Sequence, residues 1–163
     1  MIDDTVVRKL IASHITITTM ESCTGGLLAS AITNVSGASE IYPGGYVTYS
    51  NEAKIRCGVP ADVIETYGVY SKETAAAMAE ACKRFYNTQV GIGITGSLGR
   101  KDPYNPDSVS GQVYYGISID ACTSAFYMEI PEEIESREDM KKAVIKTVFE
   151  NLAEMLDRRE SEG

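Results

Sequence analysis

Ser39, Tyr49 and Lys54 are three residues that could act together on a carbonyl group, and a glycine pair, Gly44-Gly45, lies between them. A serine hydroxyl attacks a carbonyl carbon once a base takes its proton. A lysine kept neutral by burial can be that base, and a tyrosine can relay the proton. Backbone N–H groups at the glycine pair could stabilise an oxyanion. The pattern is compatible with a serine hydrolase, although a lysine after a strand is usually an ordinary surface residue.

A second candidate is the segment Glu21-Ser-Cys-Thr-Gly-Gly26, which lies between a predicted strand and a predicted helix. Gly25 and Gly26 allow a ligand to approach the backbone, and N–H groups at a helix start attract anions. Ser22 and Thr24 add hydroxyl donors, so the turn could bind a phosphate. It is not a Walker loop, because no GK[ST] follows. A capped helix start with no ligand explains the same residues equally well.

Thr95 and Gly96 form the third candidate, at the carboxyl end of a buried strand. Proteins of the α/β class commonly bind ligands at this position. Arg137, near the start of the last predicted helix, could bind an anion through two parallel hydrogen bonds. Each residue also has a purely structural interpretation, as a turn threonine and as a solvated arginine beside Glu138.

The cysteines and the single histidine favour neither a metal site nor a classical triad. Cys23, Cys57, Cys82 and Cys122 fit no zinc spacing, and we interpret them as reduced thiols of a cytoplasmic protein. Cys23 could be a nucleophile at a helix start, but a small buried thiol is the better interpretation. His14 is the only histidine, which excludes a histidine-rich metal site.

Composition narrows the class of protein. The chain has 163 residues, of which 44% are hydrophobic and 23% charged, as in a globular domain. The net charge of −8 argues against a nucleic-acid partner, which usually needs a basic face. No apolar run reaches the length of a membrane helix, and the acidic, amphipathic N-terminus does not look like a signal peptide.

Hydrophobic periodicity predicts helices and strands that alternate along most of the chain, without a repeat or a domain linker. The last two strands are joined by a short turn at Asp120, so we expect them to pair antiparallel. The order predicts an α/β fold with a mixed sheet covered by helices. The predicted helices lie at 4–13, 27–32, 51–55, 60–67, 72–86 and 137–157, and the predicted strands at 15–19, 46–49, 89–95, 113–119 and 125–130.

Taken together, these segments resemble the C-terminal domain of the CinA (competence/damage-inducible) family, the nicotinamide-nucleotide amidohydrolases also called PncC. The resemblance covers residues 3–157, and its segments follow the family's order. They are ESCTGG at 21–26, SGAS at 36–39, GGYVTYSNEAK at 44–54, GVP at 58–60, GVYSKETAAAMA at 68–79 and GITG at 93–96.

The resemblance implies hydrolysis of the carboxamide of nicotinamide mononucleotide to nicotinate mononucleotide and ammonia, in pyridine nucleotide recycling. It implies a small-molecule nucleotide as partner, no metal or other cofactor, and a homodimer or higher homo-oligomer. It also implies a three-layer α/β/α sandwich with a mostly parallel sheet. We expect one domain at 1–157 and a frayed acidic tail at 158–163.

The family's functional residues fall on polar positions already singled out. Its serine, tyrosine and lysine match Ser39, Tyr49 and Lys54, although Ser22 is also eligible as the attacking hydroxyl. The expected substrate-binding residues are Ser22, Thr24, Gly25, Gly26, Gly45, Thr95, Gly96 and, less securely matched, Arg137.

Two departures from the family's pattern leave alternatives open. The loop at 97–110 lacks the usual Gly-Pro and Lys-Pro and carries more charge. A second arginine near Arg137 is common in the family, and here Lys141 or Lys142 stands in its place. The alternatives are therefore a non-catalytic nucleotide-binding regulatory module on the same fold, or an amidase for a different carboxamide.

Overall fold

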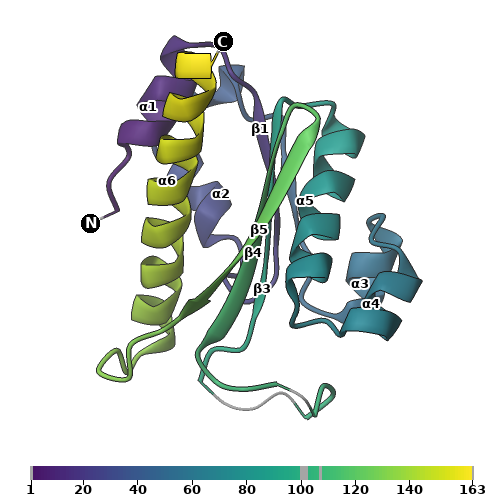
Figure 1. The fold of residues 1–163 in the computed structure, drawn as a ribbon. Helices are drawn as coiled ribbons and strands as arrows, with labels where there is room; N and C mark the ends of the chain where they lie inside the picture. Colours follow the sequence, from purple (N-terminus) through teal and green to yellow (C-terminus); the bar gives the residue numbers. More distant parts are fainter. Residues whose placement is uncertain (1, 100–102, 107, 163) are drawn as a thin grey trace.

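A five-stranded sheet lies between two layers of helices in the computed structural model, which describes residues 2–99, 103–106 and 108–162 (Figure 1). The strands lie in the order β2-β1-β3-β4-β5. This arrangement confirms the predicted α/β fold. The strands are β1 (Ile17–Glu21), β2 (Gly45–Val47), β3 (Val90–Gly96), β4 (Gln112–Ile119) and β5 (Cys122–Glu129). The helices are α1 (Thr5–Ala12), α2 (Leu27–Thr33), η1 (Ala38–Glu40), α3 (Asn51–Arg56), α4 (Ala61–Tyr67), α5 (Lys72–Tyr86) and α6 (Arg137–Glu162).

The sheet is mixed, as predicted, and partly parallel: two of its four strand pairings are parallel and two antiparallel. β1 pairs in parallel with β2 on one side and with β3 on the other. β4 pairs antiparallel with both β3 and β5, so β4 alone runs against the other strands. Because β1, β2 and β3 point the same way, their carboxyl ends meet at one edge of the sheet.

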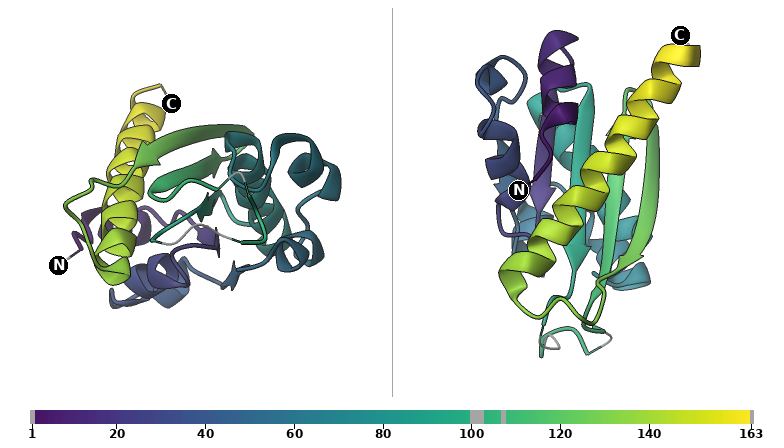
Figure 2. Two further views of the ribbon diagram at one scale, coloured as in Figure 1. Left: turned by 90° about the horizontal axis from the view of Figure 1, so that it is seen from below. Right: turned by 90° about the vertical axis from the view of Figure 1, so that its left-hand side faces the viewer.

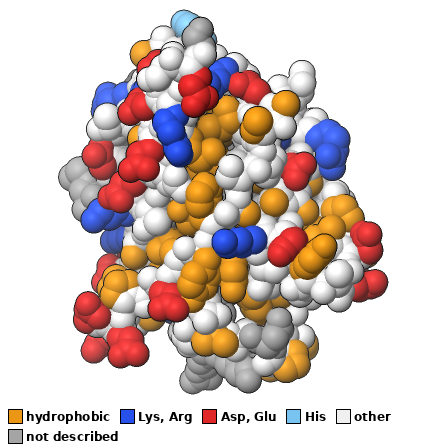
Figure 3. Space-filling view, in the orientation of Figure 1, with side chains coloured by type: hydrophobic (Ala, Val, Ile, Leu, Met, Phe, Trp, Pro, Cys, Tyr) orange, Lys and Arg blue, Asp and Glu red, His pale blue; other side chains and the backbone are white. Residues whose placement is uncertain are grey.

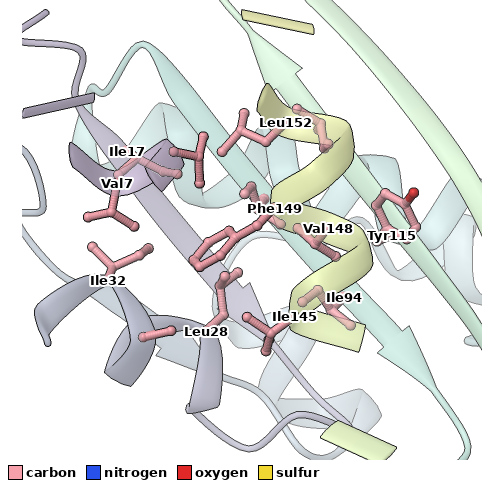
Figure 4. Close-up of a cluster of buried hydrophobic side chains, with 14 of the residues drawn as sticks. Val7, Ile17, Leu28, Ile32, Ile94, Tyr115, Ile145, Val148, Phe149 and Leu152 are labelled. Carbon is pink, nitrogen blue, oxygen red and sulfur yellow. The ribbon is translucent and has the colours of Figure 1, made fainter. Parts of the chain in front are cut away.

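The first helical layer consists of α1, α2 and α6, and the main hydrophobic core lies between it and the sheet. Phe149 of α6 lies between Ile17 of β1 and Leu28 of α2, and the neighbouring Val148 belongs to the same cluster (Figure 4). All four side chains are buried. Burial of side chains of this size contributes about 1.5–3 kcal/mol each, so this layer holds α6 firmly against the sheet.

The second layer consists of α3, α4 and α5, on the opposite face of the sheet (Figure 2). Helix α5 lies so close to β3 that a Cβ at Gly91 or Gly93 would come within 2.3–2.4 Å of the helix carbonyls of Ala79 and Ala75. The two glycines of this strand are therefore required by the close packing of α5.

Two predicted boundaries differ from the structure. The first strand begins at Ile17 rather than at 15, because the N–H of Ile15 still donates to Leu10 at the end of α1, 2.9 Å away. The last helix continues to Glu162, so the expected frayed tail is helical as far as it is described. A contact from Arg159 to Asp120, 2.8 Å long, helps to hold that end against the β4–β5 turn.

The face drawn in Figure 3 carries lysine and arginine side chains among acidic ones rather than in one continuous basic patch. No helix among the described residues has the length and apolar character needed to cross a membrane.

Candidate functional site

Lys54 is the most unusual residue at the carboxyl edge of the sheet, because its side chain is 1% exposed. Helix α3 positions it, and Ser50 caps that helix by accepting a hydrogen bond from the N–H of Ala53 at 3.0 Å. The Lys54 amine donates to the carbonyl oxygen of Thr48 at 2.9 Å and to the hydroxyl of Ser22 at 3.1 Å. The structure thus pairs a buried amine with a serine hydroxyl.

This pair lies on the wall of a cavity of about 780 Å³ at the carboxyl ends of β1, β2 and β3. The described lining residues include the guanidinium of Arg137 and the amine of Lys54, and no carboxylate. In a protein with a net charge of −8, such a lining favours an anionic ligand. The lining consists of Ser22, Cys23, Val47, Tyr49, Ser50, Asn51, Ala53, Lys54, Val69, Tyr70, Thr95, Gly96, Ser97, Leu98, Pro103, Tyr104, Asn105 and Arg137.

Arg137 reaches this cavity from the first residue of α6. Its guanidinium donates to the carbonyl oxygen of Leu98 at 2.5 Å and to the hydroxyl of Tyr49 at 3.0 Å. Tyr49 therefore lies in the cavity as predicted, but its described hydroxyl contact is with Arg137 rather than with Lys54. The ring of Tyr49 is 65% exposed, so the pair forms part of the cavity mouth.

The turn at 22–26 is held by Glu21, a fully buried residue. Its carboxylate accepts hydrogen bonds from the hydroxyl of Thr24 at 2.6 Å and from the N–H groups of Leu28 and Ala29 at 2.8 and 3.0 Å. The anion at the start of α2 is therefore Glu21 itself. The predicted phosphate cradle is replaced by the alternative, a capped helix start.

Thr24, Gly25 and Gly26 accordingly serve the backbone of this turn and do not line the cavity. Gly25 and Gly26 have φ angles of +60° and +105°, a region that favours glycine. Thr95 and Gly96 do line the cavity, as predicted. The hydroxyl of Thr95 donates to the carbonyl oxygen of Val69 at 2.9 Å, which connects the end of β3 to the segment before α5.

Ser39 lies at the opposite edge of the sheet and is exposed, so the structure does not bring it to Lys54. Two residues further on, the carbonyl oxygen of Ile41 accepts from the N–H of Ile17, the first residue of β1. Ser22 follows the last residue of the same strand, and β1 alone separates its two ends by about 13 Å. The prediction that Ser39 lies beside Lys54 is therefore wrong, and the serine found beside Lys54 is Ser22.

Gly45 also lies away from the cavity. It pairs with Thr19 in the ladder between β1 and β2. A Cβ at Gly45 would come within 2.4 Å of the Tyr42 hydroxyl and 2.7 Å of the Thr19 carbonyl oxygen. Close packing explains this glycine, so the predicted oxyanion site at Gly44-Gly45 finds no support.

Cys23 lines the cavity next to Ser22, but its thiol is poorly suited to attack. Burial raises the pKa of Cys23 from its ordinary value of 9.0 to about 12, and the charge of Glu21 acts in the same direction. This agrees with its interpretation as a small buried thiol. In the described ranges, no three His, Cys, Asp or Glu side chains lie together as metal ligands would.

The loop after β3, which its length and its departure from the family's pattern had marked in the sequence, forms part of the cavity wall, although none of its residues after Gly96 was named as a site residue. Pro103, Tyr104 and Asn105 line the cavity, and the side-chain amide of Asn51 donates to that of Asn105 at 3.2 Å. The length and polarity of the loop were the signal for a functional role. Of the predicted loop at 97–110, residues 100–102 and 107 lie outside the described residues.

Lys141, rather than Lys142, faces the turn that carries Ser22. A Cβ at Gly25 would lie 3.4 Å from the Lys141 amine. Lys142 instead lies 3.5 Å from the carboxylate of Glu138 in the next turn of α6. Of the two lysines that could stand in place of the family's second arginine, Lys141 is therefore the one that faces this turn.

Comparison with known proteins identifies related chains over the same region. The model of the CinA C-terminal domain matches residues 1–156. A putative competence-damage inducible protein of Moorella thermoacetica is 48% identical over 111 residues, which are 68% of this chain and 27% of the relative. The corresponding protein of Clostridium acetobutylicum is 37% identical over 150 residues, 91% of this chain and 36% of the relative. The chain thus spans about a third of the length of these relatives.

Solved structures agree with the fold. A CinA superfamily protein of Klebsiella pneumoniae aligns with a TM-score of 0.86 and 25% identity, over 94% of both chains. A CinA superfamily protein of Escherichia coli aligns with a TM-score of 0.84 and 26% identity, over 93% of this chain and 89% of that one.

Proposed function

Because the chain belongs to the CinA C-terminal domain family, we propose that it hydrolyses the carboxamide of nicotinamide mononucleotide to nicotinate mononucleotide and ammonia. The observation that carries the proposal is the buried Lys54 amine, 3.1 Å from the Ser22 hydroxyl on the wall of a cavity. A nucleophile and a base within hydrogen-bond reach are the minimum that amide hydrolysis through a covalent intermediate needs.

In this proposal the nucleophile is Ser22. Its oxygen attacks the carboxamide carbon while the neutral amine of Lys54 takes the hydroxyl proton. Burial favours the neutral amine because desolvation disfavours an ammonium ion. The amine donates to Ser22 in the structure; in the neutral form proposed for the reaction, its one lone pair accepts from the Ser22 hydroxyl instead, while an N–H group still donates to the Thr48 carbonyl oxygen.

The tetrahedral intermediate then collapses. The C–N bond breaks, the leaving amine takes the proton from Lys54, and ammonia departs from an ester on Ser22. Water attacks this ester while Lys54 takes one of its protons. The bond between the acyl carbon and the Ser22 oxygen then breaks, Lys54 returns the proton to that oxygen, and nicotinate mononucleotide leaves with a free carboxyl group. Cys23 is the residue after the nucleophile in a strand-turn-helix segment. In other turns of this kind the backbone N–H of that residue donates to the oxyanion, and we assign the same role to the N–H of Cys23.

Arg137 is the proposed anchor for the substrate phosphate. It is the one arginine among the described lining residues, and part of its guanidinium already bonds Tyr49 and Leu98. These two bonds hold the group in place, so it pays less entropy when it binds an anion. The rings of Tyr70 and Tyr104 also line the cavity and offer faces for a cationic pyridinium.

The test is ammonia release from nicotinamide mononucleotide by the purified protein, with the Lys54→Ala variant beside it. We expect turnover by the unmodified protein and none above background with the variant. Circular dichroism and melting curves of both proteins would show that the variant is folded.

Two other outcomes separate the alternatives. Nicotinamide mononucleotide that raises the melting temperature without ammonia release would contradict the amidase and favour a nucleotide-binding module. Ammonia release from other carboxamides at a higher kcat/KM would contradict the proposed substrate while leaving the reaction class intact.

A further inference from the structure

We propose that Glu21 is a positioning residue for the chemical step, one that fixes the distance between Ser22 and Lys54 without touching the substrate. This inference rests on the proposed role of Ser22 and Lys54. Glu21 is the last residue of β1 and is fully buried, and it does not line the cavity. Its influence on the reaction must therefore act through the groups that it holds.

The Glu21 side chain fixes the turn on the far side of Ser22. One carboxylate oxygen accepts from the Thr24 hydroxyl and from the N–H of Leu28, and the other accepts from the N–H of Ala29. These three donors come from the turn and from the first turn of α2. Because the strand and the helix are joined through one side chain, the segment that carries Ser22 cannot shift relative to either.

The Glu21 backbone fixes the other half of the pair. Its carbonyl oxygen accepts from the N–H of Thr48 at 2.7 Å. The carbonyl oxygen of Thr48 in turn accepts from the Lys54 amine at 2.9 Å. The N–H of Ser22 donates to Ile94 of β3 at 3.0 Å. Hydrogen bonds thus connect both Ser22 and Lys54 to the segment around Glu21.

A carboxylate is the group that these donors require. An amide at position 21 has the same shape but only one acceptor oxygen, and its NH₂ group would face at least one of the helix N–H donors. Two donors cannot share a hydrogen bond, so the start of α2 must move or leave an N–H unpaired. A displacement of about 1 Å at a reacting group can lower the rate about 100-fold.

The competing interpretation is that Glu21 only caps α2. In that case its loss lowers the melting temperature, and the molecules that remain folded react normally. A positioning role predicts a lower rate in folded molecules whose affinity for substrate is unchanged. The two interpretations therefore differ in kcat and agree in stability.

The experiment compares the unmodified protein with Glu21→Gln and with Thr33→Val. Thr33 lies at the other end of α2, where its hydroxyl donates to Ala29 and Ser30 at 3.0 and 3.2 Å. Thr33→Val is the matched control, because it removes a hydrogen bond of the same helix far from Ser22. Each protein is assayed below its own melting temperature.

Two readouts are taken for each protein. The first is kcat and KM for nicotinamide mononucleotide. The second is the rate at which phenylmethanesulfonyl fluoride labels Ser22, followed by peptide mass spectrometry. The labelling reaction forms a sulfonate ester on Ser22 and releases fluoride and a proton, so it needs the Ser22–Lys54 geometry but no amidase activity.

We expect Glu21→Gln to lower both kcat and the labelling rate about 10- to 100-fold, with KM within about twofold, and Thr33→Val to change neither. Labelling and kcat at the unmodified level in folded Glu21→Gln would overturn the positioning role and leave the proposed function standing. If the unmodified protein shows no turnover and no labelling of Ser22, the proposed function is overturned, and the role of Glu21 with it.

Discussion

The carboxyl and amino edges of the parallel strands carry similar residue types in different surroundings. At the carboxyl edge, Ser22 and Lys54 meet on the wall of a cavity. At the amino edge, Ser39 is exposed, and the Gly44 carbonyl oxygen accepts from the Thr18 hydroxyl at 2.6 Å. Serines and glycines occur at both edges, but only the carboxyl edge combines them with a buried amine and an opening.

The difference follows from strand direction. Chains leaving β1, β2 and β3 diverge at their carboxyl ends, and such ends leave a crevice in α/β proteins. At the amino edge, hydrogen bonds hold the segments that enter the strands close to the sheet. The N–H of Ile17, for example, donates to the carbonyl oxygen of Ile41 at 2.8 Å. The edge at which a polar residue lies is thus more informative than its type or its distance along the chain.

Removing one serine from each edge tests most directly whether the reaction takes place at the carboxyl edge. Ser22→Ala should lower kcat/KM at least about 1,000-fold, because it removes the proposed nucleophile. Ser39→Ala should stay within about twofold, because an exposed serine far from Lys54 has no part in the reaction. Ammonia release measures both. A large loss with Ser39→Ala and none with Ser22→Ala would reverse the roles of the two edges.

The rate of alkylation of Cys23 tests whether this thiol at the carboxyl edge can act as a nucleophile. The raised pKa of Cys23, about 12 instead of 9.0, means about 1,000-fold less thiolate at neutral pH. Iodoacetamide should therefore modify the exposed Cys122 and leave Cys23 unmodified from pH 7 to 9. Peptide mass spectrometry measures both sites in one sample. Rapid modification of Cys23 in the folded protein would contradict its assignment as a buried, unreactive thiol.

The raised pKa also fixes the sign of a pH dependence. Cys23 holds its proton more tightly in the folded protein than in the unfolded chain. Its contribution to stability is therefore fully present below pH 9 and is lost as the pH rises toward 12. Cys82, whose pKa burial also raises to about 12, acts in the same direction. The free energy of unfolding in urea should fall over this range.

Arg137→Gln tests the anion-binding part of the carboxyl edge. Loss of one charge-assisted contact to a phosphate costs about 1.5–3 kcal/mol, so KM for nicotinamide mononucleotide should rise about 10- to 100-fold. Lys142→Gln is the matched control on the same helix, since its contact with Glu138 is exposed and contributes little. Equal KM values for the two variants would contradict the assignment of Arg137 to the phosphate.

Gly45→Ala tests the amino edge, where we expect an effect on stability alone. The added Cβ would collide with the Tyr42 hydroxyl and the Thr19 backbone. Overpacking of this kind costs about 1–3 kcal/mol, which urea unfolding measures. The kcat of the molecules that remain folded should be unchanged. A lower kcat with unchanged stability would place Gly45 in the site after all.

The order of elements could be predicted from sequence because each helix and strand carries its own periodicity. Ser50 and Ser71 both act as helix caps, and each accepts from the N–H three residues on. The glycines of β3 allow α5 to pack closely on the strand, because no other residue tolerates a helix backbone at that distance. Chain ends were less predictable, because the contact between Arg159 and Asp120 joins residues far apart in sequence.

The site could be predicted only in part. Thr95 and Gly96 end β3, Lys54 lies in the short helix α3 after β2, and Arg137 begins α6. Each position lies near an element end that borders the cavity, so the order of elements was enough to predict it. Ser39 could not be placed, because η1 leads into the opposite end of the sheet and no local pattern reveals it. The role of Glu21 was equally hidden, since its partners become neighbours only when α2 folds back onto β1.

The length of α6 has a practical consequence. Its 26 residues extend for about 39 Å, with Arg137 beside the cavity at one end and Glu162 at the other (Figure 1). A bead or fluorophore attached to an exposed side chain of the last turn of α6, such as Glu162, would therefore be held away from the cavity mouth. The protein is suited to immobilised assays in that orientation, with its binding site facing the bulk solution.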